Sequence, residues 1–273
     1  MHFWVYWVKM GLMKKWLFIF ILIILFLAAG IFYFKKSAPK ITSPSKVLSA
    51  VEIPTATSAV IKQSTVINVQ GIPIRISWAI VNPQAVELYS NLKEQHLSEQ
   101  IKVDKSCQIL VNGGFYSKEN THLGLFISNF ETISKFSPND TRNGFLWISG
   151  NNVSIGNDLP DVNSRIALQS GPLLMQNGQP LSLKINNDEP NRHIAAGITD
   201  DQKLIFLAFY YDQSEFQGPM LGQLPEIINL FKKQTGVEIT DAINLDGGSA
   251  SVFITNYVLL RELKYVGSYF CIL

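Results

Sequence analysis

The stretch LIFLAFY at residues 204–210 is uniformly apolar and decides how this chain is expected to fold. A short apolar run that follows polar residues predicts a strand covered on both faces. Elsewhere, short apolar segments outnumber helical ones and end in turns that contain Gly or Asn. We therefore predict an α+β or mixed α/β fold, with a strand-rich central sheet and a few helices.

Other strands and two helices are predicted around this run. Residues 66–69 and 72–81 should pair around Gly71. Apolar positions 224, 227, 228 and 231 follow helical spacing, which predicts an amphipathic helix at 223–234 that Gly236 ends. A short exposed helix is predicted over the polar residues 91–100. The remaining strands are expected at 107–111, 123–127, 145–148 and 242–245.

The charge of the chain is unevenly distributed. Of 273 residues, 47% are hydrophobic and 16% charged, and residues 1–36 contain five lysines but no Asp or Glu. The 23 basic residues less these five leave 18, against 21 acidic residues, so residues 37–273 carry a formal charge of −3. No basic surface remains to bind nucleic acid, and that class of protein is excluded.

The N-terminal segment predicts attachment to a membrane. Residues 16–34 are 19 uncharged residues between two lysine pairs, long enough at about 28 Å to cross a bilayer. A cleaved signal peptide is the alternative, but the apolar run continues past Ala28-Ala29-Gly30. We therefore expect a cytoplasmic segment at 1–15, an anchor at 16–34, a Pro- and Ser-rich linker at 35–62 and an extracytoplasmic domain at 63–273. Translation could start at Met1, Met10 or Met13.

The two cysteines allow two interpretations. Outside the cytoplasm Cys107 and Cys271 could form a disulfide, and an apolar neighbourhood makes buried thiols an equal alternative. The four histidines are scattered and predict no zinc site. No cofactor pattern is evident, although a divalent cation held by loop oxygens would leave no such pattern.

Three glycine-bearing segments are the candidates for chemistry, each beside a predicted strand. Adjacent glycines permit a sharp turn or a close approach to a ligand. An Asp at the end of a strand is commonly presented into a cleft, or else caps its own turn. The segments are Asn112-Gly113-Gly114-Phe115-Tyr116, Gln169-Ser170-Gly171-Pro172 and Asn244-Leu245-Asp246-Gly247-Gly248-Ser249.

These segments, in this order, resemble the phosphodiester glycosidase family. The likeness extends over residues 65–273 and includes Gly124-Leu125, Gly178, Arg192/His193 before Gly197-Ile198, and Gly218 with Met220. There are three departures. Ser249-Ala250-Ser251 follows the second glycine of the last segment, where the family often has Gly-Ser. Ser117 stands where an Asp is common, and either Arg192 or His193 stands for the family's arginine.

The resemblance implies hydrolysis of a glycosyl-1-phosphodiester and assigns roles to residues. Asp246 would stabilise an oxocarbenium-like centre or activate water. Arg192, His193 and the amides of Gly113, Gly114, Gly247 and Gly248 would hold the diester anion. Asn112, Ser170, Gly171 and Ser249 would contact sugar or phosphate oxygens, and Tyr116 would stack on a sugar. Asp212 is a candidate second acid, although a solvated loop residue is the better interpretation.

The resemblance also implies a carbohydrate or glycosyl-phosphate substrate in the bacterial envelope. One alternative is a non-catalytic module that binds polysaccharide or serves exopolysaccharide assembly, because the altered residues around Ser249 and Arg192 would suit a degenerate site. A weaker alternative is a hydrolase of peptidoglycan- or teichoic-acid-linked material. An enzyme requires that Asn112, Ser170, Arg192 or His193, and Asp246 line one pocket.

Overall fold

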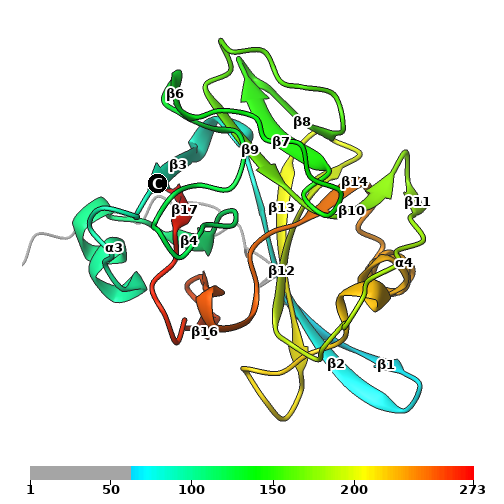
Figure 1. The fold of residues 1–273 in the computed structure, drawn as a ribbon. Coiled ribbons are helices and arrows are strands. Elements are labelled where there is room, and N and C mark those ends of the chain that lie inside the picture. Colours follow the sequence, from blue (N-terminus) through cyan, green and yellow to red (C-terminus); the bar gives the residue numbers. More distant parts are fainter. Residues whose placement is uncertain (1–62) are drawn as a thin grey trace, which may run out of the picture. The chain divides into compact units, whose positions relative to one another are not determined.

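The computed structural model describes residues 63–273, which form a mostly-β fold of three antiparallel sheets (Figure 1). The strand-rich composition predicted from the sequence is therefore confirmed. The prediction of one central sheet is wrong, because the strands divide among a seven-stranded and two five-stranded sheets. Within residues 63–273 every strand pair is antiparallel, so this part of the chain lacks the parallel strands of a mixed α/β fold.

The seven-stranded sheet has the apolar run at its centre. Strand β13 extends over Leu204–Tyr211 and pairs with β2 on one side and β12 on the other. The order of the sheet is β1-β2-β13-β12-β14-β10-β11. Its other strands are β1 (Ser64–Val69), β2 (Ile72–Val81), β12 (His193–Thr199), β14 (Ile239–Asn244), β10 (Leu173–Gln176) and β11 (Gln179–Pro180).

Both faces of this sheet are covered, as the apolar run predicts. Phe206 and Ala208 of β13 belong to the core shared with the other two sheets. Their neighbours Leu207 and Phe209 point the opposite way, into a second core under a helix. Side chains alternate along a strand, so a strand between two apolar layers has no polar face.

The helix over the second core is α4 (Leu224–Thr235), close to the predicted bounds. Its apolar stripe is fully buried, and Phe231 meets Trp78 of β2 edge-on with ring centroids 5.0 Å apart. Gly236 ends the helix with φ 74°, a left-handed conformation that a glycine adopts without strain.

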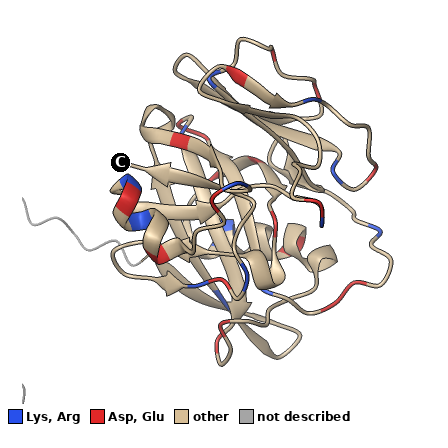
Figure 2. Ribbon diagram, turned by 60° about the vertical axis from the view of Figure 1, so that its left-hand side comes forward, with Lys and Arg blue, Asp and Glu red and all other residues tan. Residues whose placement is uncertain are grey.

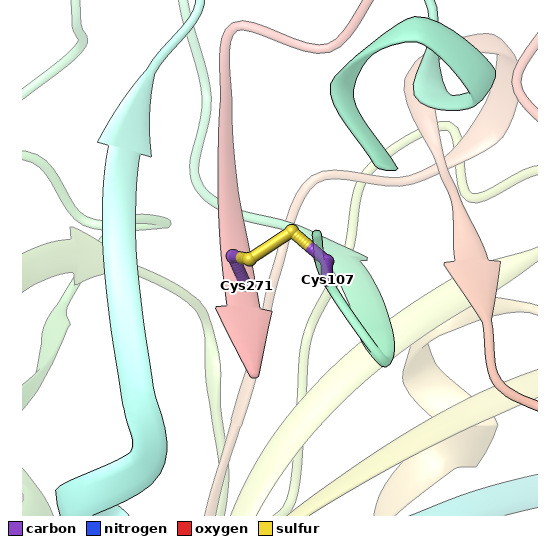
Figure 3. The surroundings of a disulfide bond; sticks show 2 residues. All are labelled: Cys107 and Cys271. Atoms are coloured by element: carbon purple, nitrogen blue, oxygen red, sulfur yellow. A yellow bond between two sulfur atoms is a disulfide. The ribbon is translucent and has the colours of Figure 1, made fainter. Parts of the chain in front are cut away.

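The second sheet contains the C-terminal strand and the disulfide. Cys107, just before β4, is bonded to Cys271 of β17, with Cα atoms 5.3 Å apart (Figure 3). The bond lies in a small core with Ile101 of helix α3 (Ser98–Lys105). The sheet order is β16-β15-β4-β17-β3, with β16 at Leu259–Leu260, β15 at Phe253–Ile254, β4 at Ile109–Asn112, β17 at Ser268–Ile272 and β3 at Val86–Ser90.

The third sheet packs one face on the shared core through apolar residues such as Leu146 and Leu168. Its central strand is β9, which carries Gln169 and Ser170 at its end. The order is β6-β5-β9-β7-β8, with β6 at Glu131–Ser134, β5 at Phe126–Ser128, β9 at Ile166–Ser170, β7 at Gly144–Ser149 and β8 at Asn152–Gly156.

The predicted helix over 91–100 is mostly wrong. The side chain of Asn91 accepts a hydrogen bond from the His96 N–H and donates to the His96 carbonyl, both at 3.0 Å. These bonds close the segment as a loop, because they offer its backbone an alternative to helical pairing. The helix α3 begins only at Ser98.

The predicted cytoplasmic segment, anchor and linker at 1–62 lie outside the described residues. Within 63–273, no helix is both long enough and apolar enough to cross a bilayer. Acidic and basic residues are interspersed along the described chain (Figure 2), and residues 63–273 contain 20 acidic and 15 basic residues.

Candidate active site

The three glycine-bearing segments meet in space, although they come from three different sheets. The Asp246 N–H donates to the Gly113 carbonyl at 3.1 Å, which joins the third segment to the first. The Gly171 N–H donates to the Asn244 carbonyl, also at 3.1 Å, which joins the second segment to the third. Strand ends from all three sheets therefore form one rigid base.

A cavity of about 530 Å³ opens above this base. Asp246 and Arg142 are the charged residues on its wall. The lining comprises Phe115, Tyr116, Leu123, Thr141, Arg142, Gly171, Pro172, Ile185, Asn191, His193, Leu221, Asn244, Asp246, Gly247, Gly248 and Ser249. Of the predicted site residues, Tyr116, Gly171, His193, Asp246 and Gly247 to Ser249 lie here, whereas Asn112, Gly113, Gly114, Ser170 and Arg192 do not. The expectation that Asn112, Ser170, Arg192 or His193, and Asp246 line one pocket is therefore met only by His193 and Asp246.

Asp246 follows β14 after one buried leucine, so a strand fixes its position. Its Oδ1 accepts the Gly247 N–H at 2.9 Å, and part of the residue remains exposed to the cavity. Burial raises the pKa of Asp246 to about 7, opposed by the Gly247 N–H and the charge of Lys264. A carboxyl group with a pKa near neutrality can exchange protons at physiological pH.

His193, at the start of β12, lines the cavity as a neutral ring. Its Nε2 is 3.0 Å from the Pro219 carbonyl, and a carbonyl only accepts, so Nε2 carries the proton. Burial lowers the pKa of His193 to about 4, despite this hydrogen bond and the charge of Asp188. At neutral pH the ring therefore offers Nδ1 as an acceptor. This state does not fit the predicted role of holding an anion.

Arg192 lies behind the cavity rather than on its wall. Its side chain is completely buried, and its Nε donates to the Ser251 hydroxyl at 2.7 Å. The two terminal nitrogens donate to backbone carbonyls of Glu215, Ser251 and Arg261 at 2.5–2.8 Å. Burial lowers the pKa of Arg192 to about 10, which still leaves it charged. The guanidinium is used to join three loops, so the structure does not place it for the predicted contact with substrate.

Asn112 and Ser170 are likewise engaged within the protein. The Asn112 amide donates to the Asp246 carbonyl at 2.7 Å and accepts the Val252 N–H at 2.9 Å. The Ser170 hydroxyl donates to the Asn244 carbonyl at 2.7 Å. Both are almost inaccessible to solvent, so they position the loop of Asp246 instead of meeting a sugar.

The glycine amides predicted to hold an anion also have internal partners. Gly113 donates to the Ser268 carbonyl at 2.7 Å and Gly114 to the Ser268 hydroxyl at 3.1 Å. Gly247 donates to Asp246, and Gly248 donates to the Arg192 carbonyl at 2.9 Å. The first two glycines allow close packing, because a Cβ on Gly113 would collide with Ser268. Their role is therefore structural.

Arg142 is the cation on the cavity wall as formed by residues 63–273, and no motif in the sequence points to it. It is half-buried, and its guanidinium makes no hydrogen bond or ion pair with any residue of 63–273. Its Nε is buried without a partner, which is costly for a charged donor. Because the side chain lines the cavity, its positive charge is available to an anionic ligand there.

The second glycine-bearing segment holds the loop of Arg142. The Gln169 amide donates to the carbonyls of Ser137 and Arg142 at 2.7 and 3.0 Å, and it accepts the N–H groups of Leu125 and Ser137. Gly171 has φ 150°, and a Cβ there would strike the backbone of this loop, 2.9 Å from the Asn143 nitrogen. The second glycine-bearing segment thus positions the loop that carries Arg142.

The remaining predicted residues divide between the cavity and the surface. Tyr116 lies on the wall, and its hydroxyl donates to the Tyr265 carbonyl at 2.8 Å. Ser249 presents an exposed hydroxyl at the cavity. Asp212 is ion-paired with Arg75 and does not line the cavity, which agrees with the interpretation as a loop residue.

Among the described residues no three His, Cys, Asp or Glu side chains are close enough to bind a metal ion. Asp246 is the one carboxylate that residues 63–273 place on the cavity wall. The suggestion of a cation held by loop oxygens stays a prediction.

The sequence of the domain matches a family model. Residues 105–272 match the phosphodiester glycosidase family, and this range contains all the cavity residues. The chain belongs to the phosphodiester glycosidase family. The resemblance inferred from the glycine-bearing segments is thereby confirmed, and members of this family are glycosidases that act on phosphodiesters. No curated protein sequence matches the chain.

Solved structures with the same fold include the catalytic domain of zebrafish N-acetylglucosamine-1-phosphodiester alpha-N-acetylglucosaminidase, auto-inhibited by its pro-peptide. It is 17% identical, with a TM-score of 0.59, and the match covers 77% of this chain and 81% of that one. A hypothetical protein from Synechocystis is 14% identical with a TM-score of 0.52, over 76% of this chain and 61% of that one. At these identities the likeness establishes the fold.

Proposed function

We propose that the protein is a membrane-anchored, extracytoplasmic hydrolase that cleaves the sugar–phosphate bond of a glycosyl-1-phosphodiester in envelope or exopolysaccharide material. The observation that carries this proposal is that a carboxyl group, Asp246, and a guanidinium group, Arg142, both lie on the wall of one cavity. A glycosyl phosphodiester has one anionic group and one electrophilic carbon, and the cavity offers one group suited to each.

In the proposed reaction Arg142 binds the phosphate oxygens, and the carboxylate of Asp246 lies near the anomeric carbon. The bond from this carbon to the phosphate oxygen breaks, and its electrons leave with the phosphate. The bond that forms joins the carbon to a water oxygen, and Asp246 accepts the proton of that water. Phosphate is a good leaving group, so a single carboxyl group on the wall suffices.

Neutral His193 assists in this scheme as an acceptor. Its Nδ1 faces the turn at Gly247, because a Cβ placed on that glycine would lie 3.4 Å from it. A sugar hydroxyl or the attacking water could donate a hydrogen bond to this nitrogen. The ring is held in place by the Pro219 carbonyl, so the acceptor is oriented in advance.

The extracytoplasmic location rests on two supports. The disulfide between Cys107 and Cys271 fits an oxidising compartment. The apolar segment at 16–34 predicts the anchor, with the domain outside the cytoplasmic membrane. The envelope or exopolysaccharide substrate follows from this location together with the family.

The proposal is tested with the full-length protein and a panel of glycosyl-1-phosphodiesters, by measuring release of reducing sugar. We expect the wild type to release sugar and Asp246→Asn to lose at least about a thousandfold in kcat. The thermal melt of the variant should match that of the wild type near pH 4, where the carboxyl group is protonated, and should lie no lower at neutral pH. Unchanged activity in the variant would remove Asp246 from the reaction. Binding of the panel without release of sugar would instead favour the polysaccharide-binding module.

A further inference from the structure

The wall of the cavity at Tyr116 continues into a second group of residues that the proposed reaction does not use. Lys264 Nζ lies 5.4 Å from the centre of the Tyr116 ring and 5.7 Å from that of Tyr265. The two rings are neighbours, with centroids 5.6 Å apart. We call Tyr116, Tyr265 and Lys264 the tyrosine–lysine wall.

Both rings of this wall are fixed by their hydroxyl groups. Tyr116 donates to the Tyr265 carbonyl at 2.8 Å, and Tyr265 donates to Asn120 Oδ1 at 2.6 Å. Tyr116 also packs tightly on the chain at Gly267, where a Cβ would overlap the ring. A platform fixed in this way loses little conformational entropy when a ligand binds.

The backbone of Lys264 is hydrogen-bonded to the loop that follows Asp246. Its N–H donates to the Ser249 carbonyl at 2.9 Å, and the N–H of Leu263 donates to the same oxygen at 2.8 Å. Ser249 lies on the cavity wall, three residues after Asp246. The wall is therefore continuous with the site of the proposed reaction.

The ammonium group of Lys264 has no carboxylate partner among residues 63–273, and the side chain is exposed. Its charge reaches Asp246, whose pKa it helps to hold down. Arg142 provides the charge needed for one phosphodiester, and it comes from a different loop, beside Gly171. Lys264 is thus a second cation beside the cavity, in excess of what a singly charged diester requires.

We propose that the tyrosine–lysine wall is a subsite for a glycosyl unit that carries its own negative charge, a carboxylate or a phosphate, because the wall adjoins Asp246 and Asp246 lies near the anomeric carbon in the proposed reaction. The proposal rests on the proposed function, since it assigns the glycosyl part of the same substrate. Lys264 pairs with the anion, and the aromatic wall contacts the sugar. The protein would then prefer charged polysaccharide fragments to neutral ones.

The test uses glycosyl phosphonates, in which a CH2 group replaces the oxygen between the anomeric carbon and phosphorus so that the ligands cannot be cleaved. The glycosyl part is glucose, glucuronic acid or glucose 6-phosphate, the alcohol part is glucose throughout, and Kd is measured by calorimetry on the full-length protein. We expect the two ligands with a charged sugar to bind about fivefold more tightly than the glucose ligand. Lys264→Gln should remove this preference without weakening binding of the glucose ligand. The matched control is Lys233→Gln, on the exposed side of α4, which should keep the preference.

The outcomes separate this proposal from the proposed function. Equal binding of charged and neutral ligands, or a preference that survives Lys264→Gln, would overturn the subsite whether or not the enzyme is active. A preference that Lys264→Gln removes would support the subsite, even in a protein that releases no sugar from the cleavable diesters. Tighter binding of glucuronic acid than of glucose 6-phosphate, or the reverse, would identify the charge.

Discussion

Two arginines near Asp246 show how differently one side chain can be used. Arg192 is completely buried and donates four hydrogen bonds to its own chain, whereas Arg142 faces the cavity with a buried nitrogen that has no partner. The first belongs to a conspicuous motif and the second does not. The motif residue Arg192 stabilises the loops around the site. Arg142, whose guanidinium is not hydrogen-bonded to any residue of 63–273, is the arginine available to a ligand.

Replacing Arg192 should have the largest effect on stability. Arg192→Met would leave carbonyls of Glu215, Ser251 and Arg261 without donors and remove a buried charge from its partners. We expect a loss of about 3–5 kcal/mol in the free energy of unfolding, measured by urea denaturation. A variant that melts like the wild type but is inactive would place Arg192 at the substrate, and the structural role assigned to it would be wrong.

Replacing Arg142 should have the opposite effect, a large loss of activity with little change in stability. Arg142→Met removes a guanidinium that forms no hydrogen bond or ion pair with any described residue, so the free energy of unfolding should change by no more than about 0.5 kcal/mol. Loss of the phosphate contact should lower kcat/KM by about a hundredfold. If this variant unfolds easily and keeps its activity, the assignments of the two arginines must be exchanged.

The pH dependence of the reaction tests the environment of Asp246. Its pKa is raised to about 7, and the proposed role requires the ionised form. Activity should therefore rise about tenfold per pH unit below pH 7 and level off above it. Lys264→Gln removes a charge that holds this pKa down, so the inflection should move to higher pH. A rate that falls as the pH rises through 7 would mean that Asp246 acts as an acid.

Stability provides an independent check on the same group. The native state retains a proton on Asp246 that the unfolded chain has already released, because the pKa rises from 3.8 to about 7 on folding. Asp246 should therefore cost stability as the pH rises from about 4 to about 7, and Asp246→Asn should remove this contribution. His193 has the opposite sign, since its pKa is lowered to about 4, and its stabilising contribution is lost as the pH falls from 6.5 to 4.

The smallest effect is expected at Ser170. Ser170→Ala removes one buried hydrogen bond, but the Asn244 carbonyl still accepts the Gly171 N–H. We expect a loss of about 1 kcal/mol in stability and a change of less than about threefold in kcat/KM. A loss of a hundredfold in activity at unchanged stability would restore Ser170 to the substrate site.

The sequence by itself determined several local elements and the family. The apolar run at 204–210 predicted a strand buried on both faces, and the stripe from Leu224 to Phe231 predicted α4, because each pattern has the period of its element. The order of the glycine-bearing segments identified the family. Asp246 and His193, both proposed as site residues from the sequence, line the cavity.

Only the tertiary structure decided which polar groups remain available for a ligand. The pairing of Cys107 with Cys271, the division into three sheets and the loop at Asn91 depend on contacts between distant residues. The same is true of the hydrogen bonds that occupy Asn112, Ser170 and Arg192 and leave Arg142 open. A sequence specifies how many donors and acceptors each side chain has, but their partners exist only once the chain has folded.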